Sequence, residues 1–111
     1  MKVVDFTLFG QSFMAMSASD ADPFNHAMSF TVNCDTQAEI DRYWNALLEG
    51  GGKPEQCGWL RDRFGVCWQI VPTVLVEMMG DPDRTKGRRA AEAMMKMVKL
   101  DIAGLTSAFK G

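Results

Sequence analysis

The chain has 111 residues, of which 47% are hydrophobic and 23% charged, and its formal net charge at pH 7 is -2. This length suits one domain with a single hydrophobic core. The mildly acidic balance differs from the basic surplus of nucleic-acid-binding proteins, so we expect no nucleic-acid partner. No apolar run approaches the roughly 20 residues of a membrane-spanning helix, so we expect no membrane association. The N-terminus lacks a signal-peptide body, and the three cysteines lack Cys-x-x-Cys spacing; both indicate reduced thiols in the cytoplasm.

The first third of the chain shows the alternation of β-strands. Residues 3–9 alternate apolar and polar side chains, residues 10–11 suit a turn, and residues 13–16 predict a returning strand. Residues 17–25 are dense in turn-forming residues and predict a connecting loop. Residues 27–34 predict a third strand. One face of it would carry Met28, Phe30 and Val32, and the other Ala27, Ser29 and Thr31.

A helix is predicted to begin after Thr36. Thr36 and Glu39 have the spacing of a capping box, in which side chains satisfy free backbone N–H groups at a helix start. Apolar residues then recur at the helical period, and three glycines at 50–52 end the helix. The predicted apolar stripe consists of Ile40, Tyr43, Trp44, Leu47 and Leu48.

Residues 56–72 predict a β-hairpin around a turn at residues 62–65. The first arm of this hairpin is the last part of a fourth strand, which is predicted over residues 53–60. In its second arm, Val66, Trp68 and Ile70 are apolar, whereas Cys67 and Gln69 between them are small or polar. We therefore expect the apolar set to pack against the helix and the other set to face the opposite side. Proline at 72 closes the strand.

The remainder of the chain predicts helices. Residues 74–79 indicate one or two helical turns, and Asp81 followed by Pro82 is typical of the start of the next helix, expected over residues 84–98. Asp101 is placed to cap a last short helix. The element order, with strands first and helices packed on one face of a sheet, predicts an α+β fold.

Several stretches together resemble a known family. These are residues 27–37, residues 40–44, the stretch from Gln56 to Gly65, and Trp68-Gln69-Ile70-Val71-Pro72. They resemble the PhnB-like branch of the glyoxalase/bleomycin-resistance (vicinal oxygen chelate) superfamily, a branch often described as demethylubiquinone methyltransferase-like. The resemblance implies β-α-β-β-β modules with a curved mixed sheet, helices on its convex face and a pocket on its concave face.

The resemblance also implies a single domain, residues 1–111, that is shortened at its N-terminus. Residues 27–72 match a complete second module, residues 1–18 match the last two strands of a first module, and residues 73–111 supply C-terminal helices. Open sheet edges in a shortened module favour association. We therefore expect a homodimer in which strands of one subunit complete or abut the sheet of the other.

Active members of this superfamily hold a divalent metal with His and Glu side chains on the concave face. At the matching positions this chain has Met14, Ala27 and Gln69, which are unsuited to a hard cation. His26, the only histidine, is one residue from the expected place and would point the other way in a regular strand, so we interpret it as a partly exposed residue at a loop edge. The sequence thus predicts neither a metal ion nor another cofactor.

The predicted pocket lining follows from the alternation and the resemblance together. It comprises Met14, Ala27, Ser29, Thr31, Cys57, Trp59, Asp62, Cys67 and Gln69. We interpret the chain as a metal-free homodimer that binds an unidentified small molecule. The alternative is an enzyme acting on a small oxygenated or quinone-like compound through Cys57, Gln69 or Asp62. A third interpretation is a structural remnant.

The sequence lacks a glycine-rich turn that would bind a methyl donor after a strand, so methyl transfer is not predicted.

Several residues have a structural interpretation beside a functional one. Cys34 precedes a helix start, which favours a lowered thiol pKa, but no base adjoins it, and we expect a buried small residue. Trp59 and Trp68 are expected in the core or as aromatic walls. Asp62 is expected to stabilise the hairpin turn as well as, or instead of, holding a ligand.

Overall fold

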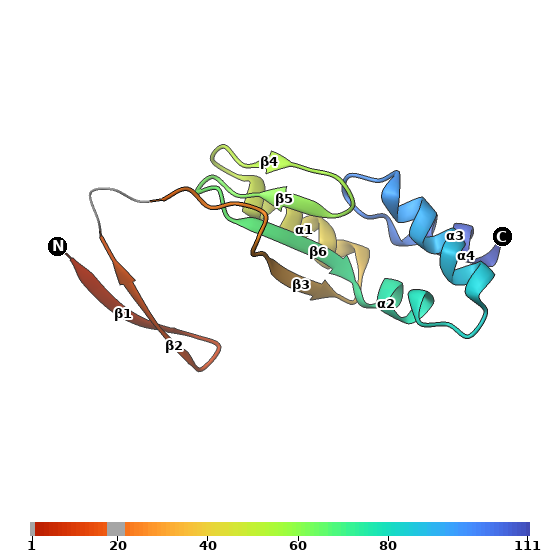
Figure 1. The fold of residues 1–111 in the computed structure, drawn as a ribbon, viewed down its shortest axis with the longest axis horizontal. Coiled ribbons are helices and arrows are strands. Elements are labelled where there is room, and N and C mark those ends of the chain that lie inside the picture. The colour runs from red at the N-terminus through yellow and green to blue at the C-terminus, as the bar shows by residue number, and fades with distance from the viewer. Residues whose placement is uncertain (1, 18–21) are drawn as a thin grey trace.

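The computed structural model describes residues 2–17 and 22–111, so the predicted loop at 17–25 lies partly outside the described residues. The structure is α+β, as predicted (Figure 1). Among the described helices, none has the length and apolar character to cross a bilayer. The strands are β1 (Val3–Leu8), β2 (Gln11–Met16), β3 (Phe30–Cys34), β4 (Lys53–Pro54), β5 (Trp59–Arg61) and β6 (Cys67–Pro72). The helices are α1 (Gln37–Leu48), α2 (Thr73–Met79), α3 (Arg84–Met95) and α4 (Ile102–Lys110).

Four strands form a mixed sheet in the order β3-β6-β5-β4. β3 and β6 are parallel, and the other two pairs are antiparallel. The helix α1 follows β3 and crosses over to the strands that lie beyond β6. The β-α-β-β-β order implied for residues 27–72 is therefore present.

Two predicted strand boundaries were wrong. Residues 53–60 form two strands rather than one, because Cys57 and Gly58 have φ angles of 60° and 83° and reverse the chain between β4 and β5. Their backbone N–H groups donate to the carbonyls of Met97 and Val98, both at 2.8 Å. β3 begins at residue 30 rather than 27, since the chain before it turns where Asn25 Oδ1 accepts a bond from the backbone N–H of residue 27.

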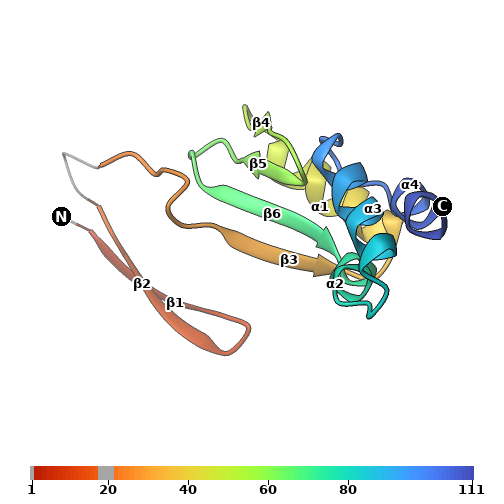
Figure 2. The same ribbon diagram turned by 45° about the vertical axis from the view of Figure 1, so that its right-hand side comes forward.

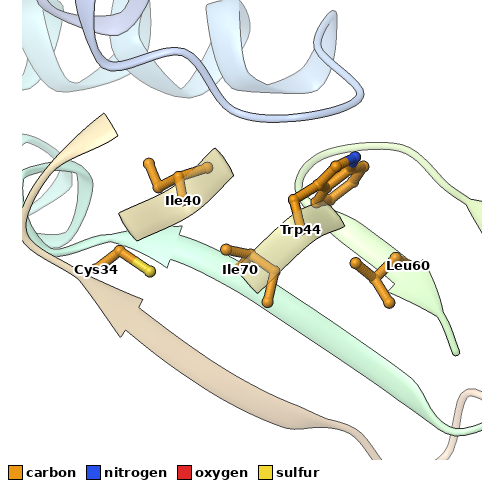
Figure 3. Close-up of a cluster of buried hydrophobic side chains, with 5 residues drawn as sticks. All are labelled: Cys34, Ile40, Trp44, Leu60 and Ile70. Carbon is orange, nitrogen blue, oxygen red and sulfur yellow. The ribbon is translucent and has the colours of Figure 1, made fainter. Parts of the chain in front are cut away.

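α1 packs on one face of the sheet, and its start is the predicted one. Thr36 Oγ1 accepts a hydrogen bond from the backbone N–H of Glu39 at 3.2 Å, as expected of an N-cap residue. Ile40 and Trp44 from the helix are buried against the sheet (Figure 3). The buried cluster consists of Cys34, Ile40, Trp44, Leu60 and Ile70, with Val32, Leu47, Leu48 and Trp68 packed around it.

This cluster confirms the predicted register of β6, because Ile70 and Trp68 both face α1. Phe30 lies on the same face as Trp68, with the two ring centroids 5.2 Å apart. However, Met28 and Phe30, which the sequence places with Val32 on the apolar face of the third strand, are both exposed rather than packed against the helix. They lie toward the N-terminal end of β3, whereas the buried side chains of this region pack near its other end, where α1 begins.

The C-terminal helices form a second core beyond the end of β6 (Figures 1 and 2). Its buried members are Leu75, Met78, Ala90, Leu100 and Leu105. Asp101 caps α4 as predicted, accepting a bond from the N–H of Gly104 at 3.0 Å. The predicted cap of α3 was wrong: Asp83 rather than Asp81 accepts the bonds of the first turn, and the helix begins at Arg84.

β1 and β2 form a separate antiparallel hairpin that stands apart from the four-stranded sheet in both views (Figures 1 and 2). All its residues are exposed. Phe6 and Phe13 are paired across the strands with their rings stacked at 5.5 Å. Together with Val4, Leu8 and Ala15 they form one largely apolar side of the hairpin, which we call the hairpin apolar face.

Candidate functional site

The face of the sheet opposite α1 carries most of the predicted pocket lining. Trp59 of β5 is paired in register with Gln69 of β6, and Arg61 with Cys67, so all four side chains share one face. Thr31 of β3 joins them through its pairing with Gln69. We call this set (Thr31, Trp59, Arg61, Cys67 and Gln69) the open face.

Polar side chains on the open face bind one another across strands. Gln69 Nε2 donates to Ser29 Oγ at 2.9 Å, which ties β6 to the segment that enters β3. Thr31 is exposed, whereas Ser29 and Gln69 are half-buried. The amide and the two hydroxyls offer both donors and acceptors to a bound molecule, and Trp59, also half-buried, offers a flat apolar surface.

At one corner of the open face, a histidine, a carboxylate and a guanidinium are joined. His26 Nε2 lies 2.9 Å from Glu55 Oε1, and Arg61 Nη2 lies 3.0 Å from His26 Nδ1. Arg61 Nε also lies 3.4 Å from Glu55 Oε2. The His26 side chain is 53% exposed, which agrees with the predicted loop-edge position. It is nevertheless held by two partners, and these were not predicted.

A hollow of about 350 Å³ adjoins this corner and is lined by His26, Glu55, Gln56 and Trp59. The rings of His26 and Trp59 are 5.9 Å apart. Cys67, which is 1% exposed, points its Sγ toward the backbone carbonyl of Asn25 at 3.6 Å. The hollow therefore has an aromatic wall, Trp59, with the polar side chains of His26, Glu55 and Gln56 around it.

The remaining predicted site residues lie elsewhere. Asp62 uses its carboxylate within the turn: Oδ1 accepts from the N–H groups of Phe64 and Val66, and Oδ2 accepts from Trp68 Nε1 at 2.9 Å. Cys57 occupies the β4–β5 turn, where its backbone bonds to the C-terminal part of the chain. Ala27 follows His26 in the segment before β3, and Met14 lies on β2, in the separate hairpin.

Cys34 does not have the lowered thiol pKa that its position before a helix favours. Burial raises the pKa of the Cys34 thiol, and the nearby carboxylates of Glu39 and Asp35 raise it further. The residue is 0% exposed, so the expected buried small residue is confirmed. A protonated, buried thiol is a poor nucleophile.

Sequence reasoning missed Glu55 and Arg61 as neighbours of His26. Arg61 could have been found, because it alternates with Leu60 on the same strand as Trp59 and must therefore share a face with Trp59. Glu55 and His26 could not. Each lies outside a regular strand, at the end of β4 and before β3, so no periodicity predicts where its side chain points.

Comparisons with known proteins agree with this architecture. The model of the 3-demethylubiquinone-9 3-methyltransferase family matches residues 1–71. The chain belongs to this family. This PhnB-like chain is similar to the PhnB protein of Bacillus cereus, which carries the same family description, at 32% identity and a TM-score of 0.53. The match covers 64% of this chain and 64% of that one.

A second solved structure, protein PA1353 from Pseudomonas aeruginosa, is 25% identical with a TM-score of 0.49, over 63% of this chain and 61% of its own. This PhnB-like chain thus spans just under two thirds of the length of both solved relatives. No curated protein matches the sequence.

Proposed function

We propose that this PhnB-like protein is a homodimer that binds a small organic molecule on its open face, with no metal ion at the positions of Met14, Ala27 and Gln69. The observation that supports this proposal is the contrast between the two faces of one sheet. The face toward α1 is packed with Ile70 and its neighbours, whereas the opposite face presents hydroxyls, an amide and Trp59. Such a mixture of an aromatic wall and a few polar groups is typical of ligand sites.

The homodimer is supported by the hairpin. A two-stranded hairpin without further packing is marginally stable in water, yet β1 and β2 expose Val4, Phe6, Leu8 and Phe13 together. A second copy that covers the hairpin apolar face would remove these side chains from water. Met14 lies on the other side of the hairpin, paired with Asp5.

The alternative is an enzyme that acts on a small oxygenated or quinone-like compound. Trp59 favours a flat ring as ligand, and the family description names a quinone derivative. The sequence suggests three polar groups for catalysis. Gln69 lies on the open face, Cys57 lies in a turn, and the Asp62 carboxylate accepts a hydrogen bond from Trp68 within the hairpin. Gln69 would then polarise or orient an oxygen of the substrate.

A thermal-shift screen with a chelator present tests ligand binding. We expect at least one organic metabolite, with flat and oxygenated compounds foremost, to stabilise the protein. At a ligand concentration of 100 times Kd the free energy of unfolding would increase by about 2.7 kcal/mol.

The thermal shift should be lost in Gln69→Leu, which keeps the size of the side chain and removes the amide. It should be retained in Val76→Ala, which changes an exposed residue of α2. Chemical change of the compound, followed by mass spectrometry, would favour the enzyme. A shift that Gln69→Leu leaves unaltered would contradict the proposed site.

Size-exclusion chromatography with light scattering tests the homodimer. The chain has a mass of 12.3 kDa, and we expect a particle of twice that mass at micromolar concentration. A stable monomer under these conditions would contradict the dimer and leave the hairpin apolar face without its proposed cover.

A further inference from the structure

Three side chains that commonly bind transition metals meet at the corner of the open face. A ring nitrogen of His26, a carboxylate oxygen of Glu55 and Cys67 Sγ all lie within 4.8 Å of one another. We infer that this group, which we call the corner site, binds zinc or a similar divalent cation. The inference does not depend on the proposed small-molecule function. It also uses none of Met14, Ala27 and Gln69, the positions at which the sequence led us to expect no metal.

The donor set determines the class of cation. Imidazole nitrogen and thiolate sulfur favour zinc, cobalt and nickel, whereas magnesium and calcium prefer oxygen ligands alone. Three protein ligands leave a fourth position of a tetrahedral zinc ion for water or another molecule. The hollow of about 350 Å³ beside His26 and Glu55 provides room for that fourth ligand.

Cys67 is the ligand that makes the site selective. Its side chain is 1% exposed, and a cation binds cysteine as the thiolate, so the sulfur bonds the cation only after losing the thiol proton. Binding of the cation would release that proton and leave a neutralised thiolate. Affinity should therefore increase with pH.

Arg61 is a competitor for His26. When Arg61 Nη2 donates to Nδ1 at 3.0 Å, the proton of a neutral ring is on Nε2 and points to Glu55. A cation on Nε2 moves the ring proton to Nδ1, where it would face the guanidinium N–H. Arg61 must then withdraw from His26, although its Nε can still bind the outer oxygen of Glu55. Removing the positive charge of Arg61 should consequently strengthen cation binding.

Cobalt titration of the untagged, chelator-dialysed full chain tests the site, because a cobalt–thiolate bond gives a charge-transfer absorption in the near ultraviolet. We expect saturation at one cobalt per chain and displacement by zinc. His26→Ala and Cys67→Ser should each weaken cobalt binding by about 100-fold or more. Loss of a residue that only hydrogen-bonds to a metal ligand already weakens metal binding by about 10- to 100-fold. Cys67→Ser should also abolish the absorption. The matched control, Cys57→Ser, should retain both.

Arg61→Met keeps the aliphatic stem and should tighten cobalt binding by about three- to tenfold, because it removes a positive charge beside the cation. Should Cys67→Ser fail to fold, as judged by circular dichroism, His26→Ala and Glu55→Gln provide the same test from side chains that are not fully buried. The inference is overturned if cobalt does not saturate, if it binds without the thiolate absorption, or if Arg61→Met weakens binding.

Discussion

At the scale of single residues, Asp62 shows how one carboxylate can organise a hairpin. Its two oxygens accept three hydrogen bonds, two from backbone N–H groups of the turn and one from Trp68 Nε1. The bond to Trp68 orients the indole at the edge of the core under α1. Asp62 is thus a turn and core residue by geometry, although it stands in the most family-like stretch of the sequence.

Asp62→Ala should destabilise the protein by about 2 kcal/mol, because it leaves three hydrogen-bond donors without their acceptor. A hydrogen bond to a charged group contributes about 1.5–3 kcal/mol, and water replaces part of that loss at this partly exposed turn. Asp62→Asn should lose less, since its amide oxygen can still serve the turn. Urea unfolding measures both changes. Unchanged stability of Asp62→Ala together with lost ligand binding would instead assign Asp62 to the pocket.

Cys34 should be the least reactive of the three free thiols. It is fully buried and its pKa is raised, whereas Cys57 is half-buried. During alkylation of the native protein, followed by mass spectrometry of the labelled peptides, Cys57 should react first and Cys34 only on unfolding. Labelling of Cys34 at the rate of Cys57 would show that its burial is incomplete.

The same thiol has a consequence for alkaline stability. The folded protein keeps the Cys34 thiol protonated to a higher pH than the unfolded chain does. The stabilisation that results from this raised pKa is therefore complete below the ordinary thiol pKa of 9.0 and is lost as the pH rises through the pKa of the folded state. Cys34→Ala should therefore remove part of the stability loss between neutral pH and pH values above 9.0. Denaturant unfolding at a series of pH values measures this difference.

At the scale of elements, the alternation along β6 separates packing from binding. Ile70 is 0% exposed and lies against Ile40 and Trp44, whereas its neighbour Gln69 points to the other face. The contrast arises from the pleat, which sends successive side chains to opposite sides of the sheet. A shift of one residue in pairing would exchange the two sets.

Ile70→Ala should destabilise the protein by about 2–5 kcal/mol, the usual effect of a cavity in a packed core. Thr31→Ala, on the exposed opposite face, should change stability by about 0.5 kcal/mol or less. Thermal or urea unfolding of the two variants compares the faces directly. Similar losses in both would mean that the open face is packed against something in solution.

At the scale of the whole molecule, the hairpin is the part that the chain itself leaves uncovered. The molecule measures 56 Å along its longest axis and 28 and 25 Å along the others, and the hairpin lies at one end of the long axis (Figure 1). Its apolar face resembles the α1-facing side of β6 in composition. In the four-stranded sheet such a face is packed by a helix; here a second copy of the chain is the proposed cover.

Replacing both Phe6 and Phe13 by serine should convert the proposed dimer to monomer, because each large aromatic side chain contributes roughly 1.5–3 kcal/mol when fully buried. Light scattering measures the mass, and circular dichroism should show that α1 to α4 remain. Phe64→Ser, which changes an exposed aromatic residue in the β5–β6 turn, serves as control and should leave the mass unaltered. A double variant that stays dimeric would place the interface elsewhere.

Local chemistry in the sequence determined the start of α1, the cap of α4, the α+β class and the two faces of β6. Each depends on neighbours within a few residues: Thr36 with Glu39, Asp101 with Gly104, and the period of two along residues 66–70. Tertiary packing, in contrast, brings His26 and Glu55 to Arg61 and Cys67 at one corner and leaves the hairpin apart from the sheet. His26 and Glu55 lie outside regular strands, so the positions of their side chains depend on how the chain packs rather than on local periodicity.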